Sequence, residues 1–292
     1  MRYAAIDIGS NAVRLLIADI IENGSDISFK KNTLLRVPLR LGDDAFIDKN
    51  ISKKKSEELL KTMIAFKHLI DVYKVEDYRA CATSAMREAK NGAELVKIIS
   101  EKAGIDLEIV EGQSEANIIY SNHIEQSLDR KKNYLYIDVG GGSTELTVFA
   151  GKMIASRSFP LGTVRMLDNA DTADSWEEIK NWIKLNTKEF AALTGIGTGG
   201  NINKLFKMSE VKDGMPFNVS KLREMYNYLN SFSLKERITV LGLNQDRADV
   251  IIPACEIYLY VMKLAGIKEI YVPRVGMVDG IIQLLIEKNR KS

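Results

Sequence analysis

The sequence predicts an α/β protein made of two similar domains. Short apolar runs typical of buried strands alternate with longer segments whose apolar residues recur at helical spacing. The order strand, aspartate, apolar residue and glycine occurs in both halves, at residues 4–10 and again at 135–141. The 292 residues also exceed the usual size of one domain, about 100 to 200 residues. We therefore expect an internal duplication that gives two domains facing each other across a cleft.

The first half begins with strands. Residues 3–8 and 13–20 are apolar enough to form two buried strands joined by a turn at Gly9, and residues 27–35 continue this β-rich opening. Apolar residues at helical spacing then predict a long helix over 52–72. The remaining elements predicted in this half are strands at 78–83 and 107–110 and helices at 92–103 and 114–124.

The second half repeats the opening after a polar and charged connection at residues 126–133. We place the domains at 1–125 and 126–292, and the closing segment 278–292 is a candidate to pack back on the first domain. The elements predicted here are strands at 134–139, 145–149 and 270–272, helices at 179–193, 221–232, 248–265 and 278–289, and a glycine-rich turn at 195–200.

Composition excludes several classes of protein. Lys and Arg number 41 against 39 acidic residues, a balance too even to predict bulk attraction to nucleic acid or to an acidic membrane. No apolar run approaches the roughly 18 residues of a membrane span, so a cytoplasmic location is the default expectation. Cys81 and Cys255 are predicted to be buried thiols, and neither histidine has a second imidazole at metal-ligand spacing.

Two glycine-rich turns can bind phosphate. Glycine lets the backbone approach a ligand closely, so Gly140-Gly141-Gly142 can aim several N–H groups at one anion, and Ser143 and Thr144 add hydroxyl donors. The aspartates that precede the turns, Asp7 and Asp138, would repel a bare phosphate unless a hard cation lay between them. The pattern therefore predicts Mg²⁺ or another divalent cation. A flexible hairpin is the alternative for each turn alone, but both turns occur in matching strand contexts.

With these residues assembled, the chain resembles the exopolyphosphatase and guanosine pentaphosphatase family of the actin, sugar kinase and Hsp70 ATPase superfamily. The resemblance covers most of the chain and implies two tandem ribonuclease H-like domains. The second loop, Ile137 to Leu146, is its most specific stretch. The other matching segments are Ala5 to Asn11, Ala82 to Ala89, Gly112 to Ala116, Leu161 to Arg165 and Gly197 to Gly200.

The resemblance implies a role for each residue of the site. Glu115 would orient and deprotonate the attacking water, and Arg87 would contact the transferring phosphoryl group. Asp138 and Glu145 would hold the metal, with Asp7 contributing directly or through water. The residues expected to bind phosphate are Ser10, Asn11, Gly141, Gly142, Ser143 and Thr144.

Three departures from the family pattern stand out. Ser114 replaces the first of a frequent glutamate pair and leaves Glu115 as the sole carboxylate of residues 112–116. Asn201 stands where threonine is common, and Val278-Asp279-Gly280 replaces a frequent Arg-Glu-Gly. The contacts of these two loops therefore stay open. Longer members of the family add helical domains that extend the polyphosphate channel, whereas this chain is expected to have two domains, so processivity on long chains is the property that the resemblance supports least.

The resemblance leaves three functions to compare. The first is a hydrolase that releases terminal orthophosphate from inorganic polyphosphate or from guanosine pentaphosphate. The alternatives are a kinase of the same superfamily and a nucleotide-dependent binding protein. Measuring orthophosphate release with and without an acceptor separates the hydrolase from the kinase. A homodimer is the default oligomeric state for a soluble enzyme.

Overall fold

The chain folds into two compact units. The computed structural model describes residues 1–24, 26–129 and 131–290. Unit 1 combines Met1–Asn122 with Met277–Ser292, and unit 2 is His123–Gly276. The domain limits 1–125 and 126–292 stay a prediction.

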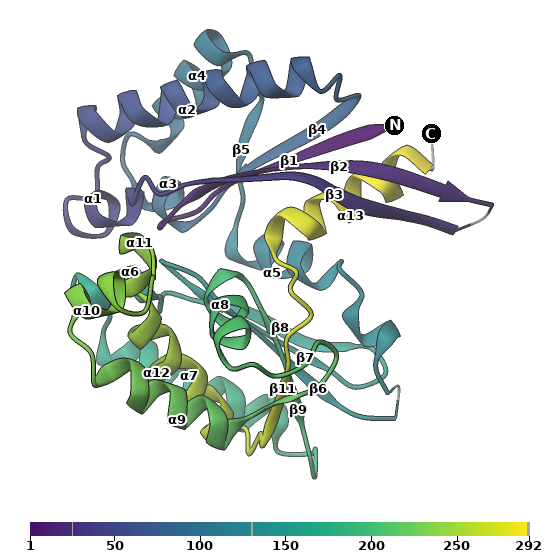
Figure 1. The fold of residues 1–292 in the computed structure, drawn as a ribbon, viewed down its shortest axis with the longest axis vertical. Coiled ribbons are helices and arrows are strands. Elements are labelled where there is room, and N and C mark those ends of the chain that lie inside the picture. Colours follow the sequence, from purple (N-terminus) through teal and green to yellow (C-terminus); the bar gives the residue numbers. More distant parts are fainter. Residues whose placement is uncertain (25, 130, 291–292) are drawn as a thin grey trace. The chain divides into compact units, whose positions relative to one another are not determined.

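Unit 1 is built on a five-stranded mixed sheet in the order β3-β2-β1-β4-β5. The first three strands pair antiparallel, whereas β4 and β5 continue parallel to β1. Figure 1 shows α2 and α4 on one face of this sheet and α5 and α13 on the other. The strands are β1 Arg2–Ile8, β2 Val13–Asn23, β3 Asp26–Val37, β4 Asp77–Ala82 and β5 Leu107–Ile109. The helices are α1 Leu41–Ile47, α2 Lys53–Val72, α3 Ser84–Glu88, α4 Gly92–Ala103, α5 Gly112–Tyr120 and α13 Met277–Arg290.

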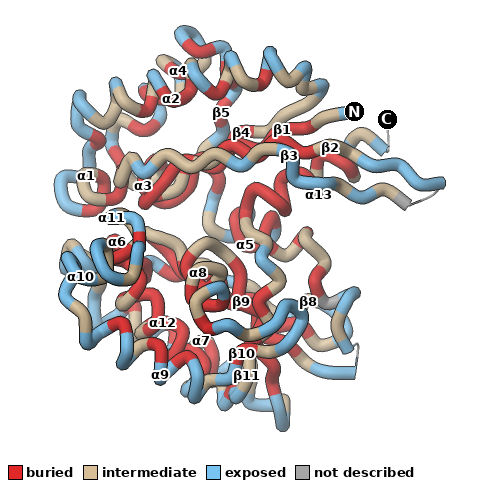
Figure 2. Tube along the Cα trace, in the orientation of Figure 1, coloured by how far each residue is buried: buried red, intermediate tan, exposed pale blue. Residues whose placement is uncertain are grey.

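The last helix completes the core of unit 1. Met277, Val278 and Ile281 of α13 pack against Tyr3, Ala5 and other apolar side chains of the sheet. Figure 2 shows β1 and the inner side of α13 as buried. An apolar face of this kind is stable in water only when it is covered. The segment at the end of the sequence therefore folds as part of the unit that contains its beginning.

Unit 2 repeats this plan around a six-stranded sheet in the order β10-β11-β9-β6-β7-β8. Strands β6, β7 and β8 pair antiparallel, and β9 lies parallel to β6, as β4 lies beside β1. The strands are β6 Tyr134–Val139, β7 Thr144–Phe149, β8 Met153–Phe159, β9 Thr194–Thr198, β10 Phe217–Asn218 and β11 Glu269–Tyr271. The helices are η1 Ile124–Ser127, α6 Thr163–Leu167, α7 Ala173–Thr187, α8 Gly200–Met208, α9 Val219–Asn230, α10 Leu234–Thr239, α11 Gln245–Ala248 and α12 Ile251–Leu264.

The predicted fold class, two tandem α/β domains of the ribonuclease H-like type, is confirmed. The shared core of both units is three antiparallel strands followed by a fourth strand parallel to the first. Within the described residues, no helix has both the length and the apolar character that crossing a membrane requires.

One predicted element is wrong in type. Residues 195–200 were expected to form a glycine-rich turn, but Thr194–Thr198 is a buried strand, and α8 starts at Gly200. The glycines serve packing, because a Cβ on Gly195 or Gly197 would lie 2.9 Å from side-chain atoms of Ile270 on the neighbouring strand. A glycine-rich turn and a strand that alternates with glycine look the same in the local sequence.

Tyr258 of α12 ties the two central strands of unit 2 together. Its side chain is fully buried, and its hydroxyl lies 3.2 Å from the carbonyl oxygen of Ile137 on β6 and 3.0 Å from that of Thr198 on β9. Burial, followed by the charge of Asp138, raises the pKa of Tyr258 well above its ordinary value. The phenol therefore stays a neutral donor.

We predict that Tyr258→Phe lowers the free energy of unfolding by about 1 to 3 kcal/mol, because two buried carbonyls lose their donor. Urea denaturation measures this. Tyr134→Phe is the control, because the Tyr134 hydroxyl reaches only one carbonyl, that of Asp129 at 2.9 Å. Equal losses in the two variants would contradict the strand-bridging role.

Candidate functional site

The first glycine turn connects β1 to β2 and carries Asp7, Ser10 and Asn11. It closes with a hydrogen bond from the Gly9 amide to the Ala12 carbonyl, 3.2 Å long. The carbonyls of Ser10 and Asn11 accept from the amides of Gly42 and Arg40 at the start of α1, at 2.9 and 3.0 Å. The carbonyl groups of the turn are thus bound to the start of α1, which holds the turn in place.

The second turn connects β6 to β7 and repeats this arrangement. Gly140 donates to the Ser143 carbonyl at 2.9 Å. The carbonyls of Gly140 and Gly141 accept from the amides of Thr163 and Val164 at the start of α6, at 3.0 and 2.8 Å. The approach is close, since a Cβ on Gly162 would lie 2.5 Å from the Gly141 oxygen. Both turns are held through their carbonyls by the helix that follows the third strand.

This anchoring leaves donors of the second turn available to a ligand. Within the described residues, the amides of Gly141 and Gly142 donate to no backbone carbonyl, and the Ser143 hydroxyl has no hydrogen-bond partner. Converging free N–H groups of this kind form an anion-binding concavity. The Thr144 hydroxyl differs from the sequence expectation, because it donates to the Leu161 carbonyl at 2.6 Å. Its proton is therefore committed to the protein.

Unit 1 gathers the predicted charged pair where its parallel strands end. Arg87 lies in the last turn of α3, directly after β4, and Glu115 lies in the first turn of α5, after β5. Their side chains approach to 3.7 Å, and Arg87 also donates to the Val110 carbonyl at 2.6 Å. Glu115 is buried, with 8% of its surface exposed. A charge in such a place is retained only when it is paired, so the pair is held in a defined geometry.

Ser10 links the first turn to the segment that bears Arg87. Its hydroxyl and that of Ser84, the first residue of α3, lie 2.8 Å apart. At the end of β1, Asp7 is ion-paired with Arg14 at 2.5 Å. The structure therefore places Asp7, Ser10, Asn11, Arg87 and Glu115 at the carboxyl ends of parallel strands β1, β4 and β5. Ligands of open α/β sheets bind at this edge.

In unit 2 the two predicted metal ligands share one face of the sheet. Asp138 and Glu145 are directly opposite each other in the β6–β7 ladder, so their side chains project to the same side. Asp138 accepts from the Thr198 hydroxyl at 2.6 Å, and Glu145 accepts from the Ser158 hydroxyl at 2.7 Å. A Cβ on Gly199 would lie 2.7 Å from an Asp138 carboxylate oxygen, so glycine keeps this approach open.

The two carboxylates suit Mg²⁺ better than a metal that takes all its ligands from the protein. Both groups are hard carboxylate oxygens, and each keeps an orienting hydroxyl partner. No set of three or more His, Cys, Asp or Glu side chains is gathered for a metal in the part of the chain that the structure describes. Mg²⁺ is usually held by one or two carboxylates, with waters and substrate phosphates completing its shell. Asp138 and Glu145 fit that pattern.

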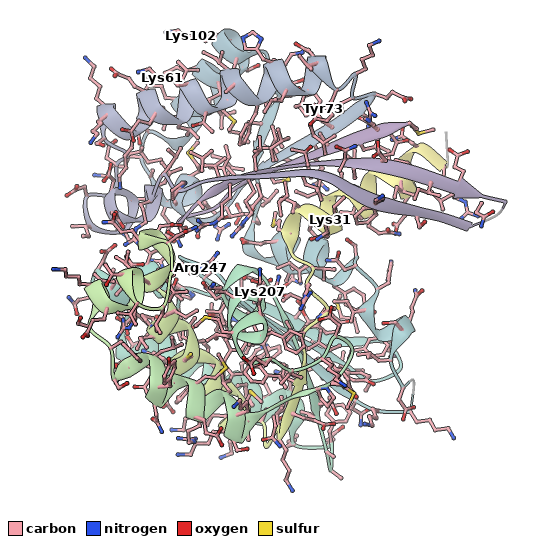
Figure 3. The ribbon with its side chains drawn as sticks, viewed as in Figure 1. Lys31, Lys61, Tyr73, Lys102, Lys207 and Arg247 are labelled. Atoms are coloured by element: carbon pink, nitrogen blue, oxygen red, sulfur yellow. The ribbon has the colours of Figure 1, made fainter. Side chains whose placement is uncertain are left out.

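Sequence reasoning assigned no role to several basic residues of unit 2. Arg165 is buried and donates from Nε to the Gly142 carbonyl at 2.5 Å. On α8, Lys204 and Lys207 follow Asn201 at helical spacing, and Asn201 accepts from Arg247 of α11 at 2.6 Å. Figure 3 shows Arg247 and Lys207 on these two neighbouring elements. Burial, then the charges of Lys207 and Arg247, lowers the pKa of Lys204. Only folding brings Arg247 to α8, so no local sequence signal announced this cation cluster.

These observations define a class of protein. Each unit presents a strand, an acid and a glycine turn at the edge of its sheet, with free amides at the second turn, a buried Arg–Glu pair in unit 1 and a carboxylate pair in unit 2. This is the equipment of a phosphate-transferring or phosphate-hydrolysing protein.

The chain belongs to the Ppx/GppA phosphatase family, whose model matches residues 21–289. The predicted family is thereby confirmed, together with membership in a class of phosphatases.

Individual relatives agree with this assignment. A bifunctional 3-dehydroquinate synthase/phosphatase of Fusobacterium nucleatum is 31% identical over 85% of this chain, which spans only 41% of the length of that relative. Exopolyphosphatase 2 of Mycobacterium tuberculosis is 24% identical over 96% of this chain and 97% of its own. The crystal structure of an exopolyphosphatase from Cytophaga hutchinsonii has a TM-score of 0.85 at 21% identity, covering 99% of this chain and 98% of the other.

We predict that Lys204→Met raises the thermal midpoint in low salt without polyanions. The pKa of Lys204 is lower in the folded chain than in the unfolded chain, so protonation opposes folding fully at neutral pH. This penalty fades only as pH rises past the folded pKa toward the ordinary value of 10.5. The gain should shrink near 1 M salt, where the screening length is about 3 Å. Lys235→Met, at an exposed lysine of α10, is the control. An equal rise of the thermal midpoint in both variants would show that the gain does not come from removing the charge of Lys204.

Proposed function

We propose that the chain hydrolyses the terminal phosphoanhydride bond of inorganic polyphosphate and releases orthophosphate. The observation that carries this proposal is the buried Glu115 carboxylate held 3.7 Å from Arg87 at the edge of the sheet. Two relatives whose names identify them as exopolyphosphatases support the substrate class.

Each group has a distinct task. Glu115 accepts a proton from the water that attacks the terminal phosphorus, and Arg87 offsets charge on the phosphoryl oxygens. Phosphate oxygens are bound by the free amides of Gly141 and Gly142 and by the Ser143 hydroxyl. Ser10 and Asn11 contribute from the first turn. Thr144 ends the second turn, and its hydroxyl stays bonded to Leu161. Lys204 and Lys207 add positive charge on α8, the helix whose Asn201 donates to the Val139 carbonyl at the end of β6. Direct attack by water is proposed because no cysteine is placed as a nucleophile, and burial raises the pKa of Cys255 to about 12.

Asp138 and Glu145 are proposed to hold Mg²⁺ or another divalent cation, with Asp7 contributing directly or through water. When bound, the ion neutralises charge on the substrate phosphates. The Asp7 oxygen that meets Arg14 is already engaged, which favours the water-mediated form. Cytoplasmic location and a homodimer stay predictions.

Guanosine pentaphosphate is the second candidate substrate, because its terminal bond is the same phosphoanhydride. A superfamily kinase and a nucleotide-dependent binding protein are the remaining alternatives. Orthophosphate release from short-chain polyphosphate, long-chain polyphosphate and guanosine pentaphosphate, measured in parallel with and without a small-molecule acceptor, separates them. Release that depends on an acceptor, or absence of release from all three, would refute the proposed hydrolase.

The metal proposal predicts a binding effect that does not depend on turnover. Mg²⁺ should raise the thermal midpoint of the wild type without substrate, because a ligand that binds the folded state stabilises it. Asp138→Asn should lose most of this increase, since the amide keeps the shape of the side chain but not its charge. Asp129→Asn, an exposed acid outside the site, is the control. An unchanged Mg²⁺-dependent shift in Asp138→Asn would show that the ion binds elsewhere.

Glu115→Gln should lower kcat by about 100- to 10,000-fold, the range for loss of a general base. Gln keeps the size of the side chain, so KM for polyphosphate should change far less. Steady-state orthophosphate release measures both constants. Arg87→Ala should instead weaken binding and turnover together, because its charge meets the phosphate before and during transfer. If Glu115→Gln retains activity within about threefold of wild type, the base is another acid, with Glu145 the next candidate.

A further inference from the structure

Two helices of unit 1 stand at both points where the chain passes between the units. Helix α5 ends at Tyr120, and the chain enters unit 2 after Asn122. It returns at Met277, the first residue of α13. Every covalent connection to unit 2 therefore starts from the end of α5 or the start of α13.

These two helices touch through their backbones. A Cβ on Gly280 would lie 1.9 Å from the carbonyl oxygen of Ile118, which is a severe steric clash. Glycine is required here for close approach, because no positive φ is recorded at Gly280. The contact fixes the first turn of α13 on α5, three residues beyond Glu115.

A buried hydroxyl joins the same junction. The side-chain Oγ of Ser121, the residue that caps the C-terminus of α5, lies 2.6 Å from the Ile118 carbonyl and 3.1 Å from the Gly280 carbonyl. Its single proton serves one oxygen on each helix, so the end of α5 and the start of α13 share one donor. Ser121 has only 6% of its surface exposed, and water cannot readily replace this bond.

The start of α13 is also tied to the sheet. Asp279, beside Gly280, forms an ion pair with Lys31 of β3 at 2.6 Å. Figure 3 shows Lys31 beside this end of α13. An acidic residue in the first turn of a helix is favourable for the helix dipole as well. Helix α13 is thus fixed to β3 on one side and to α5 on the other.

We propose that Ser121 and Gly280 are positioning residues for Glu115. They hold α5 at its far end, while the bond from Arg87 to the Val110 carbonyl holds the short segment between β5 and α5. Glu115 lies between these two fixed points, and its carboxylate is placed by the helix rather than by a flexible loop. This inference rests on the proposed function, in which Glu115 is the general base.

The test is Ser121→Ala, which removes the shared donor and adds no bulk. We expect kcat for polyphosphate to fall about tenfold, because small displacements of a reacting group are costly, with KM within about twofold of wild type. Ser209→Ala is the matched control: Ser209 also ends a helix, is buried, and donates to the carbonyl three residues earlier, at 2.7 Å, but it lies on α8. Its kcat should stay within about twofold of wild type.

A double-variant comparison distinguishes positioning from general packing. In a Glu115→Gln background, Ser121→Ala should lower kcat by less than about twofold, because the group that it positions is already lost. The same tenfold loss in both backgrounds, or equal losses for Ser121→Ala and Ser209→Ala, would overturn the proposal. Failure of the proposed function is seen separately, as near wild-type activity of Glu115→Gln alone.

Discussion

The hydrogen bonds from the helix after the third strand to the carbonyls of each glycine turn are the constraint on which the rest of the site depends. A tight turn has both donors and acceptors, and a phosphate ligand needs the donors alone. When α1 and α6 occupy the carbonyls of the turns, an anion meets N–H groups rather than a mixed surface. Both units hold their turn in this way, through different residues, as an internal duplication predicts.

Burial also determines how the charged side chains of unit 2 are paired. Asp138 and Glu145 lie in a nearly closed environment, each with a hydroxyl donor, and Tyr258 stays neutral beneath them. Lys204 of α8 is charged at a cost, because its burial first, and then the nearby charges of Lys207 and Arg247, lower its pKa. Unit 2 thus keeps both an acid pair and a cation cluster; under the proposed function the acids would hold a divalent cation and the cluster would attract the negative charge of the substrate.

The proposed catalytic pair of unit 1 is placed by regular secondary structure. Arg87 and Glu115 sit at the ends of short helices that follow parallel strands, and their geometry is set by the strands beneath and by α13 above. Because α13 belongs to the core of unit 1 although it follows unit 2 in sequence, the end of the helix that carries Glu115 is bonded to a residue from the far end of the chain, through Ser121 and Gly280.

The sequence by itself determined the elements whose signals are local. The strand, aspartate and glycine order at Asp7 and Asp138, the helical spacing of α2 and the family segments were all readable, because each depends on neighbouring residues. Where a glycine could serve either a turn or packing, as at Gly195 and Gly197, local pattern failed, since the deciding neighbour, Ile270, lies on another strand.

Only the tertiary structure decided which groups remain available to a ligand and which are committed to the fold. The hydroxyl of Thr144 is used by Leu161, whereas that of Ser143 has no partner within the described residues. Arg247 reaches α8 through Asn201, and Gly280 meets Ile118 across two helices. Hydrogen-bond partners and close approaches join residues far apart in the chain, so they are fixed by packing, whereas secondary structure follows from preferences that each short segment already carries.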